Sequence, residues 1–266
     1  VLNLQHWHDF LKMLKRAGYI YPGMITSETA LVYTYALWLI GKRDFGLDLT
    51  TLRDLAARWF FMSSLTGRYT SSPETRMDQD LAMLRNQTQP EFIRLLEQEM
   101  TAVLTPDYWQ VTLPNDLATA SARSTGQFAY FAALCVLDAP VLYSGMKVRD
   151  LLDPTAHPKK QALERHHLFP RKYLERQGYT DFRDTNQVAN YALVEWHDNI
   201  DISDRSPAEY APKYEKRFTR AELQAMYRYH ALPERWYEMD YRSFLEERRK
   251  GIAAIVREGF DKLSGK

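Results

Sequence analysis

The stretch "LERHHLFPRKYL", residues 163–174, decides how the rest of the sequence is interpreted. Two histidines, His166 and His167, are adjacent, and His167 stands three residues before Pro170. Basic residues flank the pair on both sides. An imidazole in such a place can fill a core, hold a metal ion, or exchange protons near neutral pH. The pair alone does not distinguish these three uses, so the choice between them depends on the surrounding sequence.

Composition sets the first limits. The chain has 266 residues, a formal net charge of +1 and one cysteine, Cys135. This length suits one large domain or two small ones. A single cysteine excludes a disulfide framework and a cysteine-built zinc site, and it favours a reducing, cytoplasmic compartment. Because the net charge is near zero, any surface that binds nucleic acid must be a local one.

We expect no membrane partner and an incomplete chain. The longest apolar run, residues 30–41, is shorter than the roughly 20 residues that span a bilayer, and no signal peptide is recognisable. The sequence starts with Val1 inside a helical pattern, which favours a piece excised from a longer protein.

Residues 1–152 predict a helical domain. Leu52, Leu55, Ala56, Trp59 and Met62 share one helical face, and residues 121–137 have the composition of a buried helix with small residues on one side. A break follows at residues 153–162, where two prolines and two lysines indicate a hinge.

The remaining chain predicts a mainly α fold with a small α+β element. "ANYALVEW", residues 189–196, alternates as a strand does, so residues 153–218 read as strand, loop, strand and helix. Ser206 with Glu209 and Thr219 with Glu222 are helix starts. Residues 219–266 predict C-terminal helices packing on this core.

Hydrolysis of a phosphodiester needs the residue types that this chain places in order. A neutral histidine can take the proton of the attacking water, and a divalent cation can stabilise the charge on the phosphate and the leaving oxygen. An asparagine oxygen suits such a cation, and a second asparagine can hold the histidine in the required tautomer. The chain offers His166, His167, Asn190 and Asn199.

"HHLFP" followed by "NQVANYALVEWHDNI" resembles the HNH nucleases of the ββα-metal fold, whose first motif is usually Asp-His-x-x-Pro. These two stretches of sequence are also similar to the C-terminal nuclease region of GmrSD-like restriction proteins, including the phosphorothioate-sensing SspE proteins. Residues 58–81 resemble the segment that these proteins carry upstream of the nuclease. The likeness covers most of the chain, and the family's N-terminal nucleotide-hydrolysing domain is missing.

The resemblance implies a role for each residue. His167 would be the general base, Asn190 would orient His167 through its backbone or amide, and His166 and Asn199 would hold one divalent metal. Many HNH sites have a carboxylate where His166 stands, so this site should bind Mg²⁺ more weakly and accept Mn²⁺, Co²⁺ or Ni²⁺ more readily. Glu164 or Asp198 could add a ligand.

Other residues allow two interpretations. A set of basic side chains is either a rim that binds DNA phosphates or a solvated face of mixed charge. These are Arg165, Arg171, Lys172, Arg205, Lys213 and Lys216. We expect Asn186 to be a cap or turn residue, Tyr191 and Trp196 to be core, and "GRYTSS", residues 67–72, to be a structural turn in preference to a phosphate-binding loop.

The resulting expectation is a metal-dependent HNH endonuclease or nickase that acts on double-stranded DNA. It would be the effector part of a bacterial anti-phage restriction protein, with the sensing of modified phage DNA left to the missing N-terminal domain. Two alternatives remain: a non-catalytic helical module that binds DNA or a partner, and a toxin-like nuclease that acts on RNA. The sequence leaves open whether one strand or both would be cut.

Overall fold

Helix α7 (Thr125–Val136) lies at the centre of the computed structural model, which describes residues 3–121, 123–155 and 163–265. Small residues on α7 let helix α14 (Tyr241–Lys262) approach closely. A Cβ atom added at Gly259 would lie 2.5 Å from the Cβ of Ala133, so a larger residue there would force the two helices apart. The predicted buried helix with a face of small residues is therefore confirmed.

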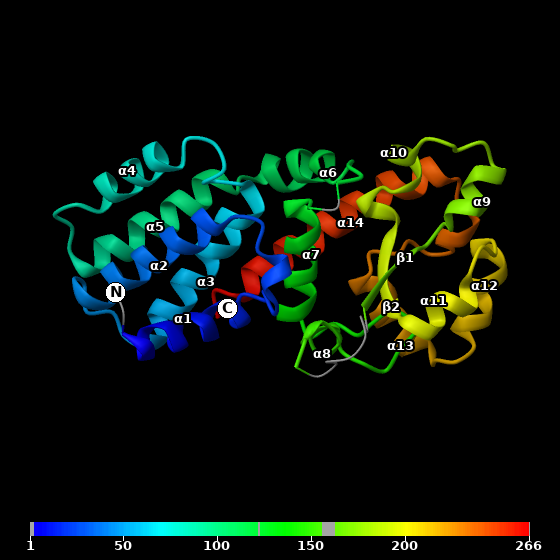
Figure 1. Ribbon diagram of the computed structural model, residues 1–266, viewed down its shortest axis with the longest axis horizontal. Helices are drawn as coiled ribbons and strands as arrows, with labels where there is room; N and C mark the ends of the chain where they lie inside the picture. The colour runs from blue at the N-terminus through cyan, green and yellow to red at the C-terminus, as the bar shows by residue number, and fades with distance from the viewer. Residues whose placement is uncertain (1–2, 122, 156–162, 266) are drawn as a thin grey trace.

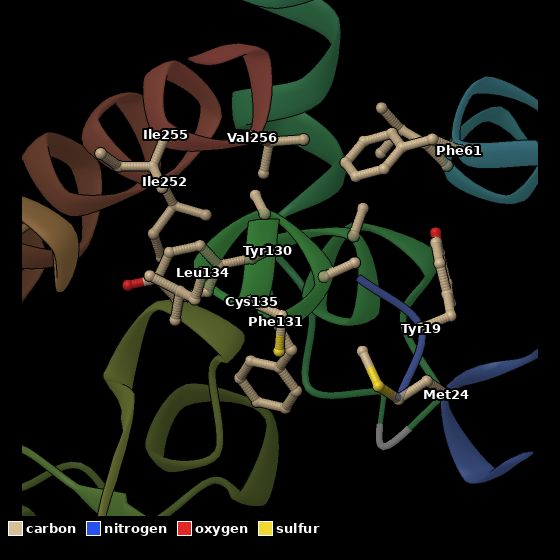
Figure 2. Packing of buried hydrophobic residues seen from close by; sticks show 14 of the residues in the cluster. Tyr19, Met24, Phe61, Tyr130, Phe131, Leu134, Cys135, Ile252, Ile255 and Val256 are labelled. Carbon is tan, nitrogen blue, oxygen red and sulfur yellow. The ribbon is translucent and has the colours of Figure 1, made fainter. Parts of the chain in front are cut away.

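Side chains from distant parts of the chain pack around α7. Ile252 and Val256 come from α14, whereas Phe61 and Tyr19 come from the N-terminal helical part and lie on the other side of α7 (Figure 2). All four are buried in one hydrophobic cluster that also includes residues of the β-strands. A single continuous core thus joins the two ends of the molecule.

The N-terminal part is helical, as predicted, and extends from one end of the long axis to the middle of the molecule (Figure 1). Its elements are α1 (Leu4–Arg16), η1 (Pro22–Met24), α2 (Glu28–Arg43), α3 (Leu49–Thr66), α4 (Pro73–Leu84), α5 (Gln89–Val103), η2 (Tyr108–Thr112), α6 (Leu113–Asp116) and, after α7, α8 (Val148–Leu152).

The other end of the molecule holds a two-stranded antiparallel sheet of β1 (Leu163–His167) and β2 (Tyr191–Glu195). His167 pairs with Tyr191 and His166 with Ala192. Helices occupy the connection between the strands and the chain after them. They are α9 (Arg171–Arg176), α10 (Phe182–Thr185), η3 (Val188–Asn190), α11 (Trp196–Ile202), α12 (Pro207–Glu215), α13 (Arg220–Tyr229) and η4 (Trp236–Glu238).

Two of the predicted helix starts are capping boxes. Ser206 with Glu209 opens α12, and Thr219 with Glu222 opens α13. Each pair satisfies backbone N–H groups that the helix itself leaves unpaired. The capping fixes where each helix begins after β2 and α11.

Arg248 ties α14 to the sheet. Its guanidinium group is fully buried and donates to three backbone carbonyl groups: those of His230 at 3.0 Å, Ala189 at 2.5 Å and Tyr191 at 2.7 Å. Two of these carbonyl groups belong to η3 and the start of β2. The position of that segment therefore depends on α14.

The predicted class, mainly helical with a small α+β element, is confirmed by this arrangement. Most of the predicted hinge, residues 156–162, lies outside the described residues. Within the described ranges, no helix combines the length and the apolar character needed to cross a membrane.

Candidate active site

The strand geometry places the two histidines on opposite faces of β1, because successive side chains of a strand point to opposite sides. His166 is buried, with 2% of its surface exposed, and packs edge-on against Tyr210, with ring centroids 5.7 Å apart. His167 is half-buried and lies against Tyr191, with ring centroids 4.5 Å apart. One histidine faces α11 and α12, and the other faces the connection before β2.

The ring of His167 is held by Asn186. Its Nε2 atom lies 3.0 Å from Asn186 Oδ1. The amide nitrogen of Asn186 donates to the carbonyl oxygen of Phe182 at 3.0 Å and to Thr185 Oγ1 at 3.1 Å, and Tyr191 donates its hydroxyl to Oδ1 at 2.9 Å. Because a carbonyl oxygen can only accept, these bonds fix which end of the amide faces the ring. Nε2 therefore carries the hydrogen, and Nδ1 keeps its lone pair.

The surroundings of His167 favour the neutral ring. Its pKa is lowered, mainly by burial; the hydrogen bond to Asn186 opposes this, and the charges of Arg171 and Arg165 lower the pKa further. A neutral imidazole with a free lone pair at neutral pH is the form that accepts a proton. The geometry is thus suited to a general base acting through Nδ1.

Asn190 holds the turn that carries the histidine, and it makes no hydrogen bond to the ring of His167. Its fully buried side chain accepts from the Phe169 N–H at 2.9 Å and donates to the carbonyl groups of Phe169 at 3.0 Å and Thr185 at 3.1 Å. Its own carbonyl group accepts from the Leu168 N–H at 2.8 Å. The expectation that Asn190 orients His167 through its backbone or amide stays a prediction: Asn186 makes the contact to the ring, and Asn190 fixes the backbone after His167.

His166 and Asn199 lie together, 33 residues apart in sequence, because α11 folds back beside β1. Nδ1 of His166 is 2.8 Å from Asn199 Oδ1. Nε2 of His166 is buried and has no hydrogen-bond partner among the described residues. Because a carbonyl oxygen only accepts, Nδ1 carries the hydrogen and donates it to Asn199 Oδ1. Burial lowers the pKa of His166 to about 4, so the ring is neutral at pH 7 and its lone pair is on Nε2.

A divalent cation at this pair would replace the hydrogen bond between Nδ1 and Oδ1, with the ring hydrogen moved to Nε2. Adjacent ligands of an octahedral ion, each about 2.1 Å from it, are about 3 Å apart, close to the 2.8 Å between Nδ1 and Oδ1. Among the described residues there is no group of three or more His, Cys, Asp or Glu that could hold a metal. Asp198 is buried and paired with Arg217 at 3.0 Å, and the side chain of Glu164 lies outside the described residues.

The expected basic rim divides into two groups. Arg165 and Arg171 both lie close enough to His167 to lower its pKa, and Arg171 also pairs with Glu175 at 2.9 Å. Arg205 and Lys213 share Asp201, at 3.1 and 3.2 Å. Lys172 and Lys216 are exposed. The positive charge next to the histidine therefore comes from Arg165 and Arg171.

Two further expectations have different outcomes. Arg68 of "GRYTSS" is buried and paired with Asp80 and with Glu99, so the interpretation of this segment as a structural turn is confirmed. Trp196, expected in the core, is instead 44% exposed at the start of α11, and Ile200 one turn later is 55% exposed. The alternation of a strand does not predict which side chains of the following helix are exposed to solvent.

Sequence reasoning missed the part that Asn186 plays. It is the C-cap of α10, as a cap or turn residue was expected to be, but its side chain is also buried against His167. The contact joins residues 19 positions apart and depends on how α10 is placed between the strands. No local pattern in the sequence signals such a contact.

The comparisons with known proteins assign the chain to no family. No family model, no curated protein and no solved structure matches the chain.

Proposed function

We propose that the chain is a metal-dependent endonuclease of the HNH type that hydrolyses phosphodiester bonds in double-stranded DNA. The observation that supports this most is the pinned ring of His167, with Nε2 held by Asn186 and Nδ1 left to accept a proton. The His166–Asn199 pair, which would hold a divalent cation in place of its hydrogen bond, comes from the adjacent strand residue and from the helix after the sheet.

In the proposed reaction, Nδ1 of His167 takes a proton from water as the water oxygen attacks phosphorus. The resulting imidazolium keeps its Nε2–H on Asn186 Oδ1, which stabilises the positive charge. A divalent cation such as Mg²⁺ or Mn²⁺, held by His166 and Asn199, would supply positive charge for the phosphate and the leaving oxygen. Because the two histidines lie on opposite faces of β1, the phosphate would have to lie at the edge of the strand to reach both. Proton transfer of this kind contributes about 10²–10⁴-fold to a rate.

The substrate would be bound mainly through its phosphates. Arg165 and Arg171 lie beside His167, and Lys172 follows on α9. Contacts to phosphate carry no base information, so binding should be weakly sequence-specific and sensitive to salt. Arg205 and Lys213 are the weaker candidates for this role because both share Asp201.

The biological setting of the proposal rests on the sequence resemblance. In it, the chain is the cytoplasmic effector part of a modification-sensing restriction protein that acts on phage DNA. An N-terminal nucleotide-hydrolysing domain would control when the nuclease acts.

The test is incubation of the purified chain with supercoiled plasmid in Mg²⁺, Mn²⁺ or a chelator, with a structured RNA as a parallel substrate. Open-circular or linear plasmid that requires metal supports the proposal, and linear product without a lasting open-circular stage indicates paired cutting. Cleavage of RNA alone would show that the chain is instead a toxin-like nuclease that acts on RNA. DNA binding without any cleavage in either metal would show that the chain is instead a non-catalytic DNA-binding module.

A further inference from the structure

A second polar site lies away from the two-stranded sheet, where five helices meet. The C-terminal ends of α1, α7 and α14 converge there with the starts of α3 and α8 around a cavity of about 530 Å³. Six cationic side chains and one acidic one, Asp153, line it, and Ile20, Val136 and Leu263 form its apolar part. The cations are Lys12, Lys15, Arg16, Arg53, Arg149 and Lys262.

Only part of this charge is neutralised by the protein. Arg16 pairs with Asp54 at 2.5 Å, and Arg53 pairs with buried Asp9 at 3.3 Å. Within the described ranges, the other four cations make no ion pair. The Nε atom of Arg53 is buried and has no hydrogen-bond partner among the described residues. The cavity therefore has a surplus of positive charge.

Helix electrostatics explain some of these residues but not their convergence. Lys15 and Arg16 lie in the last turn of α1 and Lys262 in the last turn of α14, where cations are stabilised by the helix dipole. Arg53 pairs with Asp9, and Arg149 of the short helix α8 donates to the carbonyl group of Cys135 at 3.2 Å, near the end of α7. The gathering of six cations with one acid at the same cavity leaves positive charge that an anion would neutralise.

We propose that this cavity binds a small organic polyphosphate, a molecule of nucleotide size that carries two or more phosphate groups. Its volume lies within the range of small-molecule sites. The cations surround the ionic groups, and Ile20, Val136 and Leu263 take the apolar body of the ligand. A DNA duplex would instead need cations in a line that follows the spacing of its phosphates, and these surround one hollow.

The experiment is calorimetric titration of the whole chain with ATP, inorganic triphosphate and AMP at low ionic strength, without divalent metal. We expect ATP and triphosphate to bind saturably and AMP to bind at least about tenfold more weakly, because it brings fewer charges to the same cations. ATP should bind more tightly than triphosphate, since only ATP reaches the apolar residues. This proposal does not depend on nuclease activity.

The variant is the double substitution Lys15→Ala with Lys262→Ala. Both lysines are exposed and make no ion pair with described residues, so the fold should survive, and the melting temperature checks that it does. It should weaken ATP binding about tenfold or more, whereas Arg76→Ala, an exposed arginine on α4, should leave it unchanged. The proposal is overturned if ATP shows no saturable binding, if the double variant binds ATP as the wild type does, or if only binding of a DNA duplex is weakened.

Discussion

Nε2 of His167 and Oδ1 of Asn186 are joined by a hydrogen bond of 3.0 Å, and the other contacts of the Asn186 amide fix its direction. The amide thereby selects one tautomer of the histidine. Since only a ring nitrogen without hydrogen can accept a proton, this single contact decides which of the two ring nitrogens can serve as a base. Asn186 acts through His167 and is a positioning residue.

Substitution of Asn186 tests this relationship. Asn186→Ala should lower the turnover of plasmid nicking about 10–100-fold, the usual cost of removing a group that orients a catalytic histidine. Asn186→Asp keeps an oxygen acceptor in place and should retain most of the activity. DNA affinity, measured by gel shift, should be the same in both variants. Equal activity of the Ala and Asp variants would mean that the hydrogen bond does not position the base.

The metal site can be tested without catalysis. Mn²⁺ at about 100 times its dissociation constant should stabilise the wild type by about 2.7 kcal/mol, seen as a higher melting temperature. The shift should be lost in His166→Ala and in Asn199→Ala, with each variant compared with and without metal. His197→Ala, an exposed histidine on the same helix α11, is the matched control. A full shift in either ligand variant would contradict the assignment.

Arg248 should be critical for stability. Its substitution by methionine leaves three buried carbonyl groups without a donor, at about 1–3 kcal/mol each, so the free energy of unfolding should fall by about 3 kcal/mol or more. Arg249→Met, at the neighbouring half-exposed residue, should change it by less than about 0.5 kcal/mol. Urea unfolding of the two variants measures the difference, and similar values would show that the three bonds contribute little.

His230 predicts a dependence of stability on pH. Burial lowers its pKa to about 4, against 6.5 in an unfolded chain. Its contribution is therefore fully present above pH 6.5 and is lost as the pH falls from 6.5 toward 4, by up to about 1.4 kcal/mol per pH unit. Between pH 7 and pH 5, His230→Gln should lose about 2 kcal/mol less stability than the wild type in urea unfolding. An equal loss in both would show that His230 does not carry this dependence.

Local features of the sequence predicted the elements well. The alternation before Trp196 identified β2, and the capping pairs located the starts of α12 and α13, because these patterns depend on neighbours within a few residues. The short helices α9 and α10, of six and four residues, were expected only as a loop. They are too short to show a helical period and are held by tertiary contacts.

Contacts between distant residues were the part that the sequence did not predict. His166 and Asn199 were both singled out, but their 2.8 Å separation depends on α11 returning to β1. Asn186 was assigned to a turn, and the buried Arg248 was not noticed, because both act on backbone or side chains many residues away. Burial of such polar groups is visible only after the helices have packed.

The most direct test of the central claim is metal-dependent nicking of supercoiled plasmid by wild type, His167→Ala and His197→Ala, with equal folding confirmed by circular dichroism. The account predicts that His167→Ala loses about 10²–10⁴-fold of the rate and that His197→Ala keeps it. Nicking by His167→Ala at the wild-type rate would contradict the account, because the proton of the attacking water would then have another acceptor.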